Sequence, residues 1–144
     1  MEADKKIQDE IMAVMDAFCS AYERRDMEAV LDCMARDDDV ITFGAGDDER
    51  SQGLKELKEQ LARDWSESDE ATLEIGKHTV SSAGCCAWIA ALAVIRVRLD
   101  DEVFDYDTRL TAVFEKRGDK WLIMHWHLSL PVIDEHEEWE DEEE

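Results

Sequence analysis

The sequence has few basic residues, no long uninterrupted apolar run and no zinc-type pair of cysteines. It contains 16 Lys and Arg against 38 Asp and Glu, which gives a formal net charge of −22. Nucleic-acid binding depends on Lys and Arg neutralising phosphates, so this composition argues against DNA or RNA as a partner. The longest apolar stretch, residues 83–95, ends at Arg96. It is shorter than the roughly 20 residues of a membrane helix, so we predict a buried strand and no membrane partner.

The N-terminus and the cysteines give two expectations about the compartment. Acidic and basic residues break up the first ten positions, so a signal peptide is not expected there and we predict a cytoplasmic protein. Cys19, Cys33, Cys85 and Cys86 lie in apolar segments without CxxC spacing. We interpret them as structural thiols in a reducing compartment.

The chain length fits one domain with a core of its own. The hydrophobic fraction of 44% is ordinary for a globular protein. Nine of the eleven residues in 134–144 are acidic, and blocks of like charge repel and rarely pack. We therefore predict a domain over residues 1–133 and an acidic tail over 134–144. An alternative is that this tail docks a basic protein.

Apolar residues recur at helical spacing in three N-terminal segments. The first predicted helix spans residues 4–24, with Asp4 as its N-cap. The second begins at Asp26 and runs to about Ala35, so that the two form a helical hairpin. The third predicted helix covers residues 54–65.

The remaining segments are rich in strand-forming residues and are separated by turn residues. A short strand is predicted first, and four longer ones follow after the third helix: 40–43, 71–80, 85–99, 103–115 and 120–130. Short connections indicate antiparallel neighbours. Both apolar faces are buried only if the sheet wraps around the helices. We therefore predict an α+β fold, a cone in which three N-terminal helices pack on a curved, mainly antiparallel sheet around an internal cavity.

Local motifs along the chain resemble the SnoaL-like branch of the NTF2-like superfamily. Residues 26–30, Asp-Met-Glu-Ala-Val, are similar to the "D.eal" start of that family's second helix. The more specific resemblance joins residues 109–114, RLTAVF, with residues 121–131, WLIMHWHLSLP. Together these two segments resemble the family ending "R.T.vf…W.ivH.H.S.P". The resemblance implies the NTF2-like, or cystatin-like, cone over nearly the whole chain.

This superfamily includes a ketosteroid isomerase, polyketide cyclases and dehydratases, so the fold alone does not determine a reaction. The isomerase uses a tyrosine and a protonated aspartate as an oxyanion hole and a second aspartate as base. At the matching positions this sequence has Phe18, Leu110 and Thr42. Tyr22, one helical turn later, could replace the hydroxyl, but the missing carboxylates disfavour ketosteroid isomerisation.

His125 and His127 are two residues apart on a predicted strand, so both rings should leave the same face. A metal or an acid–base pair would need this arrangement. A metal needs further ligands, and none stands at a convincing spacing. We therefore predict neither a metal nor another cofactor. The alternative is that one histidine hydrogen-bonds within the sheet and the other lines the cavity or a dimer face.

Arg96 and Arg109 lie in strands that otherwise look buried, and a buried guanidinium needs an anionic partner. One interpretation is an internal salt bridge to Asp105 or Asp107. The other is a fork in the cavity that binds a ligand's carboxylate, because arginine matches that group in a bidentate way. The sequence leaves both open.

Tyr22, Trp65 and Trp88 either wall the cavity or are plain core. We expect Tyr22 and Trp65 to line one connected pocket with Arg109 and His127. The full predicted ligand-binding set is Tyr22, Trp65, Trp88, Arg96, Arg109, His125 and His127, with His127 as the candidate catalytic residue.

The main hypothesis is that the cone binds a small, mostly apolar molecule, which these arginines would allow to carry a carboxylate. Strands 85–97 and 110–114 are apolar on both faces, so we expect the outer sheet face to form a homodimer. A second hypothesis is a lyase, isomerase or cyclase in which His127 shuttles a proton and Arg109 stabilises an enolate. A third is a homo-oligomeric protein-interaction module. The residues leave open whether the protein is an enzyme.

Overall fold

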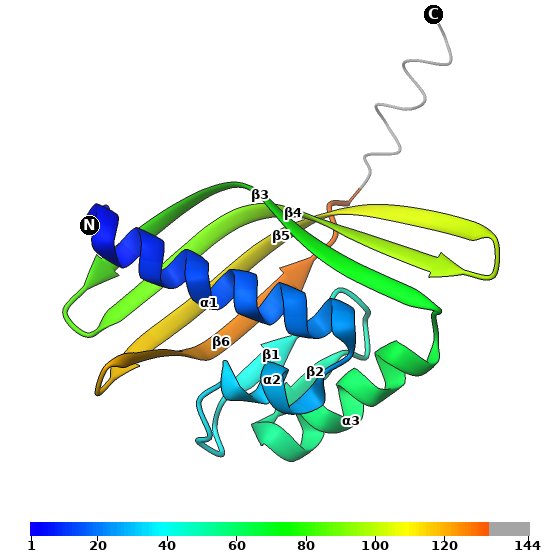
Figure 1. The fold of residues 1–144 in the computed structure, drawn as a ribbon, viewed down its shortest axis with the longest axis horizontal. Helices are drawn as coiled ribbons and strands as arrows, with labels where there is room; N and C mark the ends of the chain where they lie inside the picture. Colours follow the sequence, from blue (N-terminus) through cyan, green and yellow to red (C-terminus); the bar gives the residue numbers. More distant parts are fainter. Residues whose placement is uncertain (133–144) are drawn as a thin grey trace, which may run out of the picture.

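The computed structural model describes residues 1–132, and the predicted acidic tail at 134–144 lies outside the described residues. Three helices and six strands follow one another in these residues (Figure 1). The elements are α1 (Lys5–Arg24), α2 (Met27–Asp32), β1 (Ile41–Phe43), β2 (Arg50–Gln52), α3 (Gly53–Ser66), β3 (Glu70–Ala83), β4 (Cys86–Leu99), β5 (Glu102–Arg117) and β6 (Lys120–Ser129).

The first two helices begin at the predicted caps. The carboxylate of Asp4 accepts the backbone N–H of Ile7 at 2.9 Å, and that of Asp26 accepts the N–H of Ala29 at 3.1 Å. The second helix was predicted to run to about Ala35, but α2 ends at Asp32. The N–H of Ala35 donates to the carbonyl of Ile123 at 2.9 Å, so the chain leaves the helix to pair with β6.

The six strands form one sheet in the order β2-β1-β6-β5-β4-β3. All neighbours are antiparallel except β1 and β6, which run parallel. Strand β2 was not predicted, because its three residues carry no apolar alternation. It pairs with β1 and places the connecting loop, residues 44–49, beside α3.

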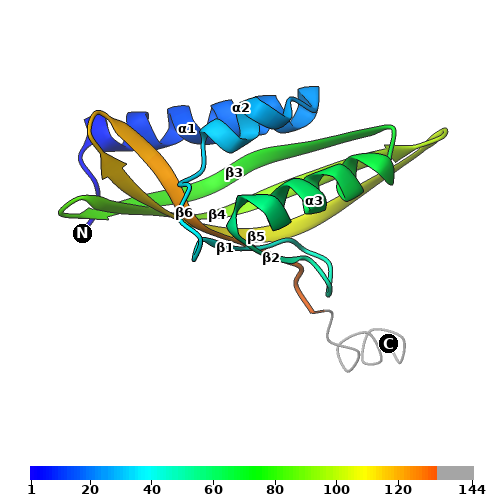
Figure 2. The same cartoon turned by 90° about the horizontal axis from the view of Figure 1, so that it is seen from below.

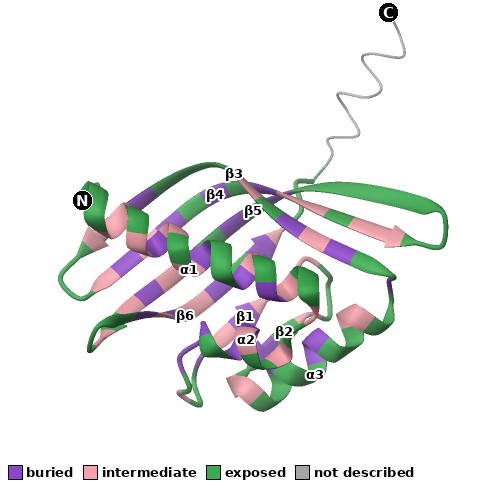
Figure 3. Ribbon diagram, in the orientation of Figure 1, coloured by how far each residue is buried: buried purple, intermediate pink, exposed green. Residues whose placement is uncertain are grey.

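Helix α1 lies along one face of the sheet, as Figures 1 and 2 show from two directions. We call this the inner face and the opposite one the outer face. Along β4 the buried residues Ala87, Ile89 and Ala91 alternate with less buried ones such as Trp88 and Leu92. Figure 3 shows this alternation, which follows from the two-residue period of a strand.

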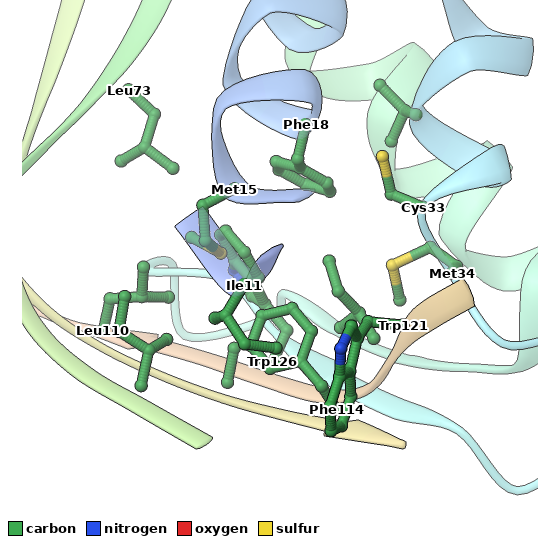
Figure 4. Packing of buried hydrophobic residues seen from close by; sticks show 14 of the residues in the cluster. Ile11, Met15, Phe18, Cys33, Met34, Leu73, Leu110, Phe114, Trp121 and Trp126 are labelled. Carbon is green, nitrogen blue, oxygen red and sulfur yellow. The ribbon is translucent and has the colours of Figure 1, made fainter. Parts of the chain in front are cut away.

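The core fills the space between α1 and the inner face (Figure 4). Ile11 and Met15 of α1 are fully buried, and so are Leu110 and Phe114 of β5. Trp126 of β6 stacks on Phe18 with ring centroids 4.5 Å apart. The apolar stripe predicted for α1 is therefore the stripe that packs on the sheet.

Strand β6 contains a bulge that decides which side chains face inward. Val113 pairs with His125, whereas the next residue of β5, Phe114, pairs with Ile123. One extra residue, Met124, therefore stands in β6. Ile123 faces inward before the bulge, and Trp126 faces inward after it.

The cysteines do not all lie in apolar segments. Cys33 is buried and Cys19 and Cys86 are half-buried, but Cys85 is exposed in the turn between β3 and β4. All four are free thiols. None of the helices in residues 1–132 is long and apolar enough to cross a membrane.

Candidate functional site

A cavity of about 420 Å³ lies between α1, α3, the β1–β2 loop and the inner face of the sheet. Its walls are mostly apolar. They include Phe18, Leu57, Leu61, Leu73, Ile95, Trp126 and Leu128. Tyr106 and Leu130 also line it and are 43% and 44% exposed, so the cavity meets solvent beside them.

Polar side chains gather at one part of this cavity. Gln60 and Asp64 stand one helical turn apart on α3, and Glu49 belongs to the β1–β2 loop. The Gln60 side-chain amide donates to Asp64 Oδ1 at 2.8 Å and to Glu49 Oε1 at 3.1 Å. Since Gln60 is only 7% exposed, one buried amide holds two carboxyl groups together.

The loop before β2 fixes the position of Glu49. The carbonyl of Glu49 accepts the N–H of Gly44 at 2.7 Å, and its carboxylate accepts the N–H of Gly46. A Cβ atom at Gly44 would lie 2.8 Å from Oε2 and 2.9 Å from Cβ of Glu49. The absence of a side chain at Gly44 therefore makes room for Glu49 to fold toward the cavity.

Asp64 has an unusual ionisation. Burial raises the pKa of its carboxyl to about 7, and a hydrogen bond shared with Glu49 and the charges of Glu49 and Glu67 act in the same direction. The hydrogen bond from Gln60 lowers this pKa. Near neutral pH the Asp64 carboxyl is therefore close to its midpoint of ionisation, and a bound cation would favour loss of its proton.

Tyr22 lines the cavity as predicted, but Trp65 does not. The Trp65 ring lies against Tyr22, with centroids 5.8 Å apart, and its indole Nε1 is buried without a hydrogen-bond partner among residues 1–132. Burial raises the pKa of the Tyr22 hydroxyl, with the charges of Asp64 and Glu49 adding to the effect. Tyr22 is therefore a neutral hydroxyl at physiological pH.

Arg25 fixes one end of the cavity. Its guanidinium donates to the carbonyl of Trp65 and, at 2.8 Å, to that of Ser68. These bonds join the end of α1 to the end of α3, the two helices that supply Tyr22 and Asp64. Arg25 does not itself line the cavity.

The predicted pocket of Tyr22, Trp65, Arg109 and His127 is wrong, because Arg109 and His127 are exposed on the outer face. In β5 the neighbours of Arg109, Thr108 and Leu110, are buried, so Arg109 points away from the core. His127 is turned outward by the bulge at Met124, which brings Trp126 inward instead.

The other predicted residues lie on the outer face as well. Trp88 and Arg96 share the outward alternation of β4. Arg96 forms the salt bridge to Asp105 that one interpretation predicted, with Nε 2.8 Å from Oδ1, but the pair is exposed rather than internal. No Lys or Arg lines the described cavity, so the case for a ligand carboxylate fails.

His125 makes the hydrogen bond within the sheet that the alternative interpretation described. Its Nδ1 donates to the carbonyl of Ile41 at 2.7 Å. The ring of His127 packs on Phe43 instead, with centroids 4.8 Å apart. Within residues 1–132, no three His, Cys, Asp or Glu side chains form a group that could hold a metal ion.

Glu49, Gln60 and Asp64 were not predicted from the sequence. Gln60 and Asp64 follow Leu57 and Leu61 at steps of three and four residues, so all four share one face of α3. Polar residues inside an apolar helical stripe were the available signal. The sequence contains no comparable signal for Glu49, because the direction of its side chain depends on the conformation of the β1–β2 loop.

Comparison with known proteins gives both the fold and the family. The first of three solved structures is an NTF2-like protein of unknown function from Pseudomonas putida KT2440, 21% identical, with 94% of each chain covered and a TM-score of 0.78. The second, from Streptomyces avermitilis, is provisionally named a dehydratase of the NTF2-like family; it is 18% identical, covers 91% of this chain and 100% of its own, and has a TM-score of 0.81.

The third is a protein of unknown function with a cystatin-like fold from Nostoc punctiforme PCC 73102. It is 15% identical, with 91% of this chain and 96% of its own covered and a TM-score of 0.75. No curated protein matches the chain. The family model of the SnoaL-like domain matches residues 11–133. With that match, and with the NTF2-like, cystatin-like fold of its structural neighbours, the chain belongs to the SnoaL-like family.

Proposed function

We propose that this SnoaL-like protein binds a small, mostly apolar molecule in the cavity between α1, α3 and the inner sheet face. The observation that carries the proposal is the cavity itself, about 420 Å³ in volume and walled mainly by apolar side chains. Protein interiors pack densely and contain few voids larger than a water molecule. Sites for small molecules are typically about 300–1,000 Å³ and apolar with a few polar groups, as here.

The enzyme hypothesis built on His127 and Arg109 gains no support from this cavity, because both side chains are exposed on the outer face. A ligand inside would not meet them. The carboxylate is withdrawn from the proposed ligand for the same reason.

Thermal unfolding with 4-phenylbutanol, an uncharged probe, tests the proposal. A ligand that binds only the folded chain stabilises it by about 2.7 kcal/mol at a hundred times its Kd. We expect the probe to raise the Tm of the wild-type protein. Ala71 lines the cavity and is 6% exposed, so Ala71→Phe should fill part of that space and abolish the rise.

The matched control is Ala62→Phe, which adds the same ring to the exposed side of α3 and should keep the response. Each variant's Tm without probe reports whether it folds. A probe effect that survives in folded Ala71→Phe, or that is absent from the wild-type protein, would contradict the proposal.

A further inference from the structure

The polar part of the cavity is built from two elements that are far apart in sequence. Gln60 and Asp64 come from α3, and Glu49 comes from the β1–β2 loop. One Gln60 amide bonds both carboxyl groups, and the Gln60 carbonyl accepts from Arg63. Both N–H donors of the Gln60 amide are thus used to hold the two acids beside the cavity.

The charges facing this part of the cavity are of one sign. Glu49, Asp64 and Glu67 line it, and none of the described lining residues is Lys or Arg. Two guanidiniums bond groups next to this part of the cavity without lining it: Arg63 donates to the Gln60 carbonyl, and Arg25 donates to the carbonyls of Trp65 and Ser68. The local field therefore favours a cation or a hydrogen-bond donor and disfavours an anion.

Thr42 supplies an observation independent of the acids. It is 7% exposed, it lines the same cavity, and its hydroxyl has no hydrogen-bond partner among residues 1–132. Its neighbours in β1, Ile41 and Phe43, pair with His125 and His127, so Thr42 points to the inner side. Thr42 pairs with Ser51, two residues after Glu49, and so shares a face with that acid. Because Thr42 lines the cavity, its hydroxyl can accept a hydrogen bond from a ligand there.

We propose that Glu49, Asp64 and Thr42 bind the protonated amine of a ligand whose apolar body occupies the rest of the cavity. This inference rests on the proposed function and names its ligand class. An ammonium has three N–H donors, which matches two carboxyl groups and a hydroxyl oxygen. The rings of Phe18, Tyr22 and Trp126 line the same space and provide aromatic faces that attract a cation.

Amine binding should be linked to release of a proton. Below about pH 7 the Asp64 carboxyl holds a proton, and the incoming positive charge favours its loss. Affinity for the amine should therefore rise as pH increases through about 7, and proton release should be largest on the acidic side. The groups facing Asp64 in this equilibrium are Glu49, Glu67, Gln60 and Tyr22, with Arg25 acting on Tyr22.

Isothermal titration calorimetry with three probes of one shape tests the inference. They are 4-phenylbutylamine, 4-phenylbutanol and 4-phenylbutanoate, measured at about pH 6 and about pH 8 in buffers of different ionisation enthalpy. At the higher pH we expect the amine to bind at least about tenfold more tightly than the alcohol, and the carboxylate to bind least. At the lower pH only the amine should release a proton.

Two variants locate the effect. Asp64→Asn and Glu49→Gln should each reduce the preference for the amine to less than about threefold while the alcohol still binds, and Asp64→Asn should abolish proton release. Glu59→Gln removes one charge from the exposed side of α3 and should change neither quantity.

Equal affinity of the wild-type protein for amine and alcohol would overturn the inference and leave the proposed function standing. Loss of the preference in Glu59→Gln would overturn it too, because the cause would then be the net charge of −22 rather than the site. If none of the three probes binds, the proposed function fails and the inference fails with it.

Discussion

At the scale of single residues, Asp64 links the cavity to the stability of the protein. Its pKa rises from 3.8 to about 7 on folding, so between these values the folded chain holds a proton that the unfolded chain has lost. Stability contributed by this group therefore falls as pH increases from about 4 to about 7. Asparagine has no charge to lose and avoids this fall.

We expect Asp64→Asn to raise the free energy of unfolding at about pH 8 by about 1 kcal/mol, or roughly 3 °C in Tm. The gain is this small because Asp64 is partly exposed and solvent screens its charge. At about pH 4 the difference should be small, since Asp64 is then largely protonated in both the folded and the unfolded chain. Urea titrations at both pH values measure the difference.

Glu59→Gln is the matched control, because it also removes one acid from a chain with a net charge of −22. It should change stability by less than about 0.5 kcal/mol at either pH. Equal stabilisation by both variants, or destabilisation by Asp64→Asn at the higher pH, would contradict this prediction. Either result would mean that the ionised Asp64 carboxylate does not destabilise the folded chain.

Residue types and spacing predict part of the site and miss the rest. Helical periodicity correctly places Tyr22 toward the cavity and wrongly places Trp65 there, because the Trp65 ring packs against Tyr22 instead of lining the cavity. Charged residues on helices are usually exposed, so nothing in the sequence singled out Asp64, although its neighbour one turn back, Gln60, is buried. Only the packing of α3 against the β1–β2 loop shows that Asp64 lines the cavity and is not an ordinary surface acid.

At the scale of elements, the helices and the four long strands follow from periodicity and turn residues. The cap at Asp4 is confirmed. Trp88 and Arg96 do share one face of β4, but it is the outer face and not the cavity face predicted for them. The side chains of β6 could not be assigned, because the single extra residue at Met124 reverses the alternation between Ile123 and Trp126. A bulge has no reliable signature in one sequence, and a shift of one residue moves every later side chain to the other face.

The same bulge determines how the cavity is closed. Because Trp126 turns inward, its ring stacks on Phe18 and forms part of the cavity wall. If regular alternation continued from Ile123 without a bulge, His125 and His127 would face the cavity, as predicted from the sequence. The bulge in β6 therefore decides whether two imidazoles or the Trp126 ring line the cavity.

At the scale of the whole molecule, the outer face of the sheet is apolar enough to suggest a partner. Leu92 is 56% exposed at its centre, and Trp88 and Val94 on the same strand are only half-buried. Exposed patches of this kind mark contact sites in soluble proteins. We expect two copies to associate through this face, although each carries a formal charge of −22.

That repulsion makes the dimer sensitive to salt. Raising the salt concentration from about 0.05 M to about 0.5 M should strengthen dimerisation, because screening weakens long-range repulsion between the copies. Sedimentation equilibrium should show Leu92→Glu as a monomer at concentrations where the wild-type chain is a dimer. Ala13→Glu, which adds the same charge on the exposed side of α1, should remain dimeric. A monomeric wild-type chain at both salt concentrations would contradict the expectation.

The central claim is that the acidic part of the cavity, and not the outer-face arginine and histidine, recognises a ligand. A crystal structure of the protein with 4-phenylbutylamine tests it most directly. We predict that the amine nitrogen lies within hydrogen-bonding distance, about 2.7–3.2 Å, of Asp64 and Glu49, with the phenyl ring beside Phe18 and Trp126. A ligand bound on the outer face beside Arg109 and His127, or one whose nitrogen points out past Tyr106 and Leu130, would contradict the claim.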